Sequence, residues 1–233
     1  EERKVLAELS ALVAEEASAL NQVVAVLRTL DLALARGRYG RWLGGVEPQL
    51  EPAAEAPFRF SGLRHPLLVW QHKRADGPPV VPISVEVSPE LRVVAITGPN
   101  TGGKTVTLKS LGLAALMARA GMLLPCSGQP SLPWCAQVLA DIGDEQSLQQ
   151  SLSTFSGHVK RIGRILEALQ RGSAPALVLL DEVGAGTDPS EGTALATALL
   201  KALADRARLT IATTHFGELK ALKYDDARFE NAS

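Results

Sequence analysis

One stretch of eight residues has the pattern G-x-x-x-x-G-K-T, which is typical of a phosphate-binding loop. Its residues are, in order, Gly98, Pro99, Asn100, Thr101, Gly102, Gly103, Lys104 and Thr105. Glycines let backbone N–H groups close around phosphate oxygens, and the lysine of such a loop reaches the β and γ phosphates. We therefore expect a nucleoside triphosphate to bind here, although a glycine-rich turn without a ligand is the alternative.

A pair of carboxylates follows an apolar run later in the chain. Asp181 and Glu182 come directly after residues 176–180, which read as a buried strand. Asp181 and the hydroxyl of Thr105 are expected to hold Mg²⁺, because hard oxygen atoms are the ligands that this ion prefers. Glu182 is then free of the metal and is predicted to be the general base that deprotonates the attacking water. A helix N-cap followed by a first-turn acid is the alternative interpretation of the pair.

Other residues are placed near the nucleotide by their position in the chain. His215 ends the apolar run 209–213 and is expected to donate a hydrogen bond to the γ-phosphate, although a lone histidine at a strand end is often structural. Val106 directly follows the loop and is assigned to the nucleotide site. Val80 or Val81 is expected to contact the base, with ordinary packing of an edge strand as the alternative.

These residues require a particular order of strands and helices. Strands are expected at 91–97, 122–126, 138–142, 176–180 and 209–213, and helices at 106–120, 154–170 and 190–207. The alternation predicts an α/β protein with a mostly parallel sheet flanked by helices. Ligands of such sheets bind beyond the carboxyl ends of the strands, and the loop, the carboxylate pair and His215 all fall there.

The first part of the chain reads as a helical arm. Residues 1–36 place apolar side chains on one helical face, with no proline or glycine before Gly37. One continuous helix would reach roughly 54 Å at 1.5 Å per residue, which suits a lever or a coiled-coil arm. Two helices packed in a bundle are the alternative. Residues 44–57 are rich in Gly, Pro and Glu, so the expected domains are an arm at 1–45 and a nucleotide-binding domain at 46–233.

Short strand-like runs lie between the linker and the phosphate loop. They comprise residues 58–60, 67–70 and 80–87, and they are interrupted by His65-Pro66 and by residues 76–79. Such runs are typical of β-hairpins. They predict a small antiparallel side sheet that flanks the nucleotide.

The composition gives few clues to the partners. The 24 Lys and Arg residues nearly balance the 25 Asp and Glu residues, which argues against a broad basic surface for nucleic acid. Cys126 and Cys135 have neither zinc-ligand nor C-x-x-C spacing and are expected to be reduced thiols in a cytosolic core. No apolar run is expected to reach the ~20 residues that span a bilayer, so a cytoplasmic protein without membrane contact is predicted. The chain opens without an initiator methionine and is expected to be part of a longer protein.

Taken together, the motifs resemble the ATPase domain of the MutS family over roughly residues 20–233. The resemblance rests on the loop, Asp181-Glu182, Thr214-His215-Phe216 and two further segments, Ser153-Thr154-Phe155 and Gly184 to Asp188. It implies an ABC-type P-loop ATPase that uses ATP and Mg²⁺, and a homodimer in which each site is completed by the opposite subunit. It assigns Ser153 a role in trans, at the γ-phosphate held by the partner's loop. Gly184 to Asp188 would lie across the subunit interface, although a plain turn is the alternative.

Three segments are more similar to the second bacterial branch of the family, MutS-two. They are Asp144 to Leu148, Ser151 to His158 and Gly184 to Glu191; Ser151 stands where mismatch-repair members usually have glycine. This resemblance implies binding of branched DNA, suppression of recombination and, in some bacteria, action on collided ribosomes. DNA contact would come largely from parts outside these residues. Members of this branch normally carry a C-terminal Smr nuclease domain, which these residues do not resemble, so no nuclease activity is assigned to them.

Two other functions are compatible with the loop. The ATP-binding subunit of a transporter requires an LSGGQ-type signature, and the segment Ser151 to Phe155 argues against it. A nucleotide-gated clamp would bind ATP and hydrolyse it little, with Glu182 serving structure.

Overall fold

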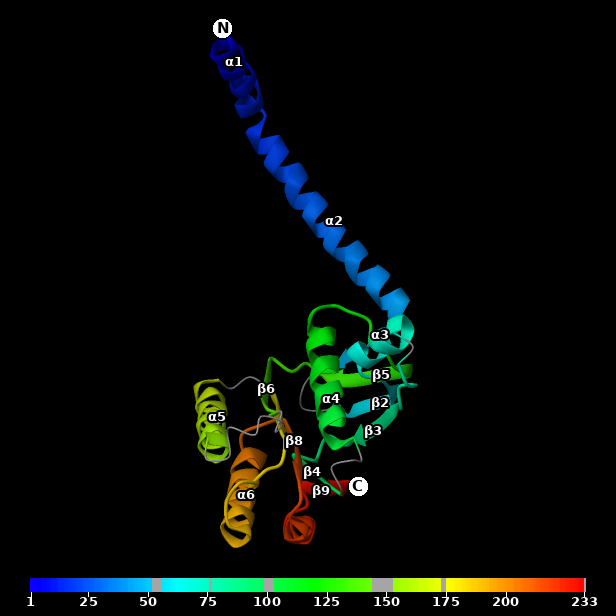
Figure 1. The fold of residues 1–233 in the computed structure, drawn as a ribbon, viewed down its shortest axis with the longest axis vertical. Coiled ribbons are helices and arrows are strands. Elements are labelled where there is room, and N and C mark those ends of the chain that lie inside the picture. The colour runs from blue at the N-terminus through cyan, green and yellow to red at the C-terminus, as the bar shows by residue number, and fades with distance from the viewer. Residues whose placement is uncertain (52–55, 76, 99–102, 144–152, 173–174, 233) are drawn as a thin grey trace.

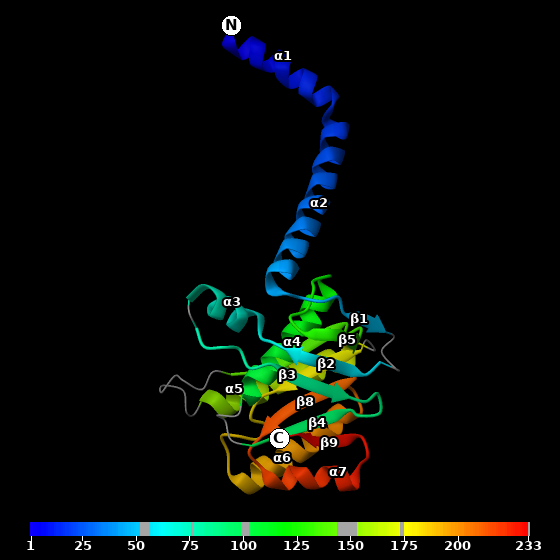
Figure 2. The same ribbon diagram turned by 90° about the vertical axis from the view of Figure 1, so that its right-hand side faces the viewer.

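The computed structural model describes residues 1–51, 56–75, 77–98, 103–143, 153–172 and 175–232. A helical arm projects from a body that is built on two sheets (Figures 1 and 2). One sheet has five strands in the order β6-β7-β8-β4-β9, and the other has four in the order β1-β5-β2-β3. The α/β class and the long N-terminal helical region are therefore confirmed.

Every pair of neighbouring strands in the five-stranded sheet is parallel. Its strands are β4 (Val93–Thr97), β6 (Gln137–Asp141), β7 (Ala176–Leu180), β8 (Leu209–Thr214) and β9 (Phe229–Ala232). All residues of β7 and β8 are buried, as expected for parallel strands that are covered on both faces. The expected strand at 122–126 does not form; Leu124 makes only an isolated antiparallel bridge with Val46.

Helices cover both faces of this sheet (Figure 1). Leu177 and Leu179 of β7 share a core with α4 (Lys104–Arg119), which lies between the parallel sheet and the side sheet. Val178 and Leu180 point the opposite way, into a core with α5 (Ser153–Arg171) and α6 (Pro189–Ala204). A 3-10 helix, η2 (Gly217–Ala221), and the short α7 (Leu222–Asp225) then lead into β9. The three expected helices are confirmed to within three residues at each end.

The side sheet is mixed, which corrects the expectation of an antiparallel one. Its strands are β1 (Gln49–Glu51), β2 (Phe58–Leu63), β3 (Ile83–Val87) and β5 (Ser127–Pro133). The pairs β2–β3 and β2–β5 are antiparallel, whereas β1 and β5 are parallel. The prediction failed because 44–57 was read as a linker on composition, while the Val46–Leu124 bridge brings the next residues alongside β5.

The apolar run 67–70 forms a helix rather than a strand. It lies in α3 (Pro66–Ala75), and Pro66 occupies the first helical position, where its fixed φ suits a helix and its missing N–H is not needed. A four-residue apolar run does not distinguish a strand from a turn of helix. Val80 and Val81 precede β3 and are part of no strand.

The arm consists of two helices that run end to end (Figures 1 and 2). They are α1 (Glu2–Glu15) and α2 (Ala17–Leu43), and Glu16 between them has φ −96° and ψ 8°. The expected continuous helix over 1–36 is thus broken once, and its second part continues past Gly37. The alternative of a bundle is also wrong, because the two helices do not lie side by side. Gly44, with φ +66°, ends α2 in the left-handed conformation that glycine favours.

The C-terminal end of α2 packs closely on the segment that follows α4. A Cβ atom at Gly40 would lie 2.7 Å from Leu123 Cδ1, so a larger residue does not fit without movement. Leu43 is buried in the core that contains α4. The arm is therefore attached to the end of α4 that lies opposite the phosphate loop.

Among the residues that the structure describes, α2 is long and apolar enough to cross a membrane by length and composition alone, with a mean hydropathy of 1.2 over 18 residues. This corrects the expectation that no such run exists. The helix also carries Arg28 and Asp31 near its middle. Each charged residue at the centre of a bilayer costs roughly 2.5–3.5 kcal/mol on insertion scales, which disfavours a spanning helix.

Both cysteines are free and buried. Burial raises the pKa of the Cys126 and Cys135 thiols to about 11, so both are protonated at neutral pH. Because the thiolate is the reactive form, these side chains contribute packing rather than chemistry.

Candidate functional site

Three strand ends meet at one edge of the parallel sheet. The register pairs Leu180 of β7 with Ala212 of β8, and Thr214 of β8 with Thr97 of β4. The phosphate-loop motif follows β4, the carboxylate pair follows β7 and His215 follows β8. The structure therefore brings the predicted site residues to the same edge, as expected for ligand sites of parallel sheets.

The described parts of the loop have the backbone conformation that glycine permits. Gly98 has φ +139° and Gly103 has φ +78°, and α4 begins at Lys104. Lys104 is only 5% exposed, and its Nζ donates to the Gly98 carbonyl oxygen at 2.5 Å. Thr105 lies in the first turn of α4 and is partly buried. The predicted residues Pro99, Asn100, Thr101 and Gly102 lie outside the described residues.

The carboxylate pair is held by the neighbouring strand. Asp181 is 7% exposed, and its Oδ1 accepts a hydrogen bond from Thr213 Oγ1 at 2.5 Å. The Glu182 N–H donates to the same hydroxyl at 2.8 Å. Glu182 has φ +52° and is the only residue other than glycine with a positive φ in the part of the chain that the structure describes. Such a conformation is strained and persists only where the surroundings hold it.

His215 contacts Glu182 directly. Its Nε2 lies 3.2 Å from Glu182 Oε1, and the two side chains are 44% and 16% exposed. The sequence predicts a contact between His215 and the γ-phosphate, and the contact that the structure describes is with the carboxylate predicted to be the general base. The pair leaves one side of the histidine open to solvent.

A third carboxylate at this edge, that of Asp141, was missed by the sequence analysis. Asp141 ends β6, accepts from Arg161 Nε and lies 2.7 Å from His158 Nδ1. Its backbone oxygen accepts from the Asp181 N–H at 2.9 Å. These contacts fix α5 next to the carboxylate pair through His158 and Arg161. The available signal was that Asp141, like Asp181, directly follows a short apolar run, here residues 138–140.

The segment after the carboxylates is a tight turn that caps α6. Gly184 has φ +86°, and a Cβ atom there would lie 2.5 Å from the Gly192 carbonyl oxygen, so only glycine fits. Asp188 is the N-cap of α6, and the hydroxyl and N–H of Ser190 hold its pKa below the ordinary value. The side chain of Ser153, at the start of α5, lies outside the described residues.

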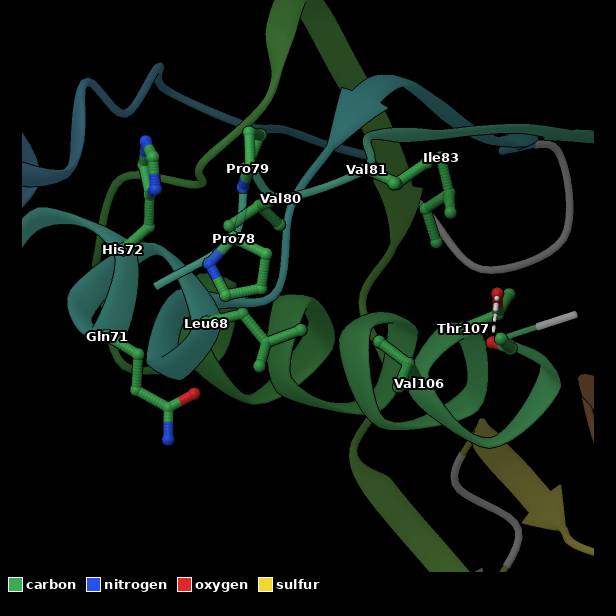
Figure 3. A pocket seen from close by; sticks show the side chains of 11 residues that line it. Leu68, Gln71, His72, Pro78, Pro79, Val80, Val81, Ile83, Val106 and Thr107 are labelled. Atoms are coloured by element: carbon green, nitrogen blue, oxygen red, sulfur yellow. Dashed lines mark hydrogen bonds between the residues drawn. The ribbon is translucent and has the colours of Figure 1, made fainter. Parts of the chain in front are cut away.

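A pocket of about 400 Å³ adjoins the phosphate loop. Figure 3 shows the side chains of Leu68 and Val80 on one side of it, and Val106 and Thr107 from the start of α4 on the other. Gly103 also lines it. The pocket thus connects two residues that the sequence assigned to the nucleotide, Val80 and Val106.

No group of three or more His, Cys, Asp or Glu side chains within the described ranges is arranged to hold a metal ion. A Mg²⁺ ion would therefore need phosphate oxygens or water in addition to protein ligands. Asp181 fits such a site, since its Oδ2 has no hydrogen-bond partner among the described residues. The hydroxyl of Thr105 supplies the same hard-oxygen chemistry.

A glycine-rich loop between β4 and α4, with carboxylates at the end of a nearby parallel strand, defines a P-loop nucleotide-binding domain. The profile of MutS domain V matches residues 94–233. The chain therefore belongs to the MutS family and contains its ATP-binding ATPase domain. Family membership also removes the transporter subunit from the possible functions.

Similar proteins share the name Endonuclease MutS2. The one from Synechocystis sp. is 58% identical over 249 residues, and those from Symbiobacterium thermophilum and Thermomicrobium roseum are 49% and 46% identical. The matches cover 99 to 100% of this chain and 28 to 30% of those proteins. The resemblance to the second bacterial branch is thereby confirmed.

Proposed function

We propose that this chain hydrolyses ATP in a Mg²⁺-dependent reaction at the strand-end site, within an ABC-type arrangement of two subunits. The observation that supports this most is the contact between Glu182 and His215. Glu182 is the neighbour of Asp181 in the sequence, and His215 follows β8, the strand that pairs with β4 before the phosphate loop. Phosphoryl transfer needs mainly positioning and neutralisation of charge, so a few well-held groups suffice.

The loop and Asp181 bind the phosphates and the metal in this proposal. The Lys104 ammonium moves from the Gly98 carbonyl to the β and γ phosphates, and backbone N–H groups at the start of α4 add the positive end of the helix dipole. Thr105 and Asp181 hold Mg²⁺. When bound, this ion neutralises charge that develops on the phosphate oxygens.

Glu182 is the general base. Its carboxylate takes a proton from water as the water oxygen attacks the γ-phosphorus, and the bond from that phosphorus to the bridging oxygen breaks. The backbone strain at Glu182 and the nearby His215 limit the orientations that the carboxylate adopts. His215 donates a hydrogen bond to the γ-phosphate and links that phosphate to the base.

The pocket beside the loop accommodates the base of the nucleotide. Its lining by Leu68, Val80 and Val106 is apolar, and its volume falls within the range of small-molecule sites. Gly103 lies at its margin, so a ligand can extend from the pocket to the phosphate loop.

Replacing Val80 by glutamate is expected to weaken ATP binding about 10-fold or more, because a carboxylate would be desolvated against the base. Leu67→Glu is the matched control, because Leu67 is 62% exposed and does not line the pocket, although its neighbour Leu68 does. Equilibrium binding of a fluorescent ATP analogue measures both. Equal affinity of the two variants for ATP would show that the nucleotide base binds outside this pocket.

Two copies form the complete site in this proposal. α5 begins at Ser153 and is fixed beside the carboxylate pair through Asp141, so its N-terminus belongs to the same edge. Ser153 acts at the partner's γ-phosphate, and Gly184 to Asp188 lie at the interface. The resemblance to the family, rather than a described contact, supports this part.

The nucleotide state moves the arm in the whole protein. We divide the chain into an arm at 1–45 and an ATPase domain at 46–233, joined where α2 packs on Leu123. The whole protein binds branched or recombining DNA and suppresses recombination, or acts on ribosomes; it is cytoplasmic and makes no membrane contact. Measuring which of branched DNA, mismatched duplex or ribosomes changes the ATPase rate of the full-length protein distinguishes these targets.

Steady-state release of phosphate from ATP tests the proposed activity. Removal of Mg²⁺ with EDTA is expected to lower the rate on the order of 100-fold, and added Mg²⁺ should restore it. Tight ATP binding with no turnover in either condition would instead support the nucleotide-gated clamp. A rate that does not depend on Mg²⁺ would contradict the metal assignment.

A further inference from the structure

Thr213 lies beside the carboxylate pair on the neighbouring strand. The register of β7 and β8 pairs Leu180 with Ala212, so the next residue of β8 stands next to Asp181. Thr213 is completely buried. Nothing in the proposed reaction uses it, although it is two residues before His215.

Its polar atoms contact three consecutive residues. The hydroxyl donates to Asp181 Oδ1 at 2.5 Å and accepts from the Glu182 N–H at 2.8 Å. The Thr213 carbonyl oxygen accepts from the Val183 N–H at 2.9 Å. One residue of β8 therefore holds the whole turn from residue 181 to residue 183.

We propose that Thr213 is a positioning residue that fixes the orientation of both carboxylates for ATP hydrolysis. The inference rests on the proposed function, in which Asp181 binds the metal and Glu182 is the base. Because the hydroxyl donates its single hydrogen to Asp181 Oδ1, the carboxylate is held in one orientation. Its Oδ2 is then left for the metal.

The same hydroxyl supports the strained backbone of Glu182. The positive φ turns the Glu182 N–H toward β8, where Thr213 Oγ1 is its acceptor. A β-branched side chain has few χ1 rotamers, so the oxygen stays where both partners need it. Without the hydroxyl, the Glu182 N–H and the buried Asp181 Oδ1 would each lose a hydrogen-bond partner.

The strand offers a matched control for burial and volume. Thr210 of β8 is also completely buried, but its hydroxyl has no hydrogen-bond partner within the described part of the chain. Valine has nearly the same shape as threonine and carries a methyl group in place of the hydroxyl. Thr210→Val and Thr213→Val therefore make the same change in the same strand, and only the second removes contacts to the carboxylates.

The experiment measures kcat, the KM for ATP and the half-saturating Mg²⁺ concentration in the full-length protein. Thr213→Val is expected to lower kcat about 10- to 100-fold and to raise the Mg²⁺ requirement, with ATP binding in EDTA unchanged. Thr213→Ser retains the hydroxyl and should remain within about 3-fold of wild type. Thr210→Val should remain within about 2-fold.

Equal losses of kcat in Thr213→Val and Thr213→Ser would show a packing role and overturn the inference. A kcat within about 2-fold of wild type in Thr213→Val would do the same. If thermal melting shows that the valine variant does not fold, Thr213→Ala is compared with Thr213→Ser, since these differ by the hydroxyl alone. Glu182→Gln is assayed in parallel: full turnover in that variant refutes the proposed base, whereas loss there with normal Thr213→Val refutes only the positioning role.

Discussion

Replacement of Glu182 by glutamine is expected to reduce ATP turnover about 10²- to 10⁴-fold while leaving ATP affinity within a few-fold of wild type. The amide keeps the length of the side chain and its contact with His215 Nε2, but it does not accept a proton from water. The backbone hydrogen bond to Thr213 is also retained. Single-turnover hydrolysis and equilibrium binding of ATP separate the two effects.

Glu218→Gln is the control for the change of charge. Glu218 lies three residues after His215, in η2, and is exposed. Its replacement should leave both turnover and binding unchanged. If Glu182→Gln hydrolysed ATP as fast as Glu218→Gln, the base would have to be another group, and Glu182 would serve structure as in the clamp alternative.

The elements that carry the site could be predicted because each has a strong local signal. The runs 176–180 and 209–213 are short, apolar and bounded by polar residues, and they form β7 and β8 with little change. The loop motif fixes the order of β4 and α4 around it. From these, the common edge of loop, carboxylates and histidine follows by the general rule for parallel sheets.

Other features depend on contacts between distant residues and could not be predicted. Thr213 and Asp181 are 32 positions apart in the sequence, and only the register of β7 with β8 brings them together. Asp141 and Arg161 meet because α5 folds back on β6. The break at Glu16 could not be predicted because no glycine or proline lies near it, and glutamate itself favours helices.

Two inactive variants, Lys104→Ala and Ser153→Ala, are expected to regain activity when they are mixed. Lys104→Ala removes the buried ammonium that we propose neutralises the phosphates, so ATP binding and turnover should be lost in its own site. In the proposed dimer, Ser153→Ala removes the hydroxyl that acts at the partner's site. A mixed dimer has one site with an intact loop and an intact partner serine, and one site that lacks both.

Random pairing of equal amounts gives half mixed dimers with one working site each, so about a quarter of the wild-type ATPase rate should return. Ser153→Ala mixed with Glu182→Gln should recover equally. Lys104→Ala mixed with Glu182→Gln should not, because Lys104 and Glu182 serve the same chain's site and every dimer then lacks one of them there. Recovery is scored only after differently tagged subunits are shown to pair. If paired Lys104→Ala and Ser153→Ala subunits did not recover activity, Ser153 would lie outside the partner's site. Recovery in only the two mixtures that contain Ser153→Ala would show that each phosphate loop is completed by the partner subunit.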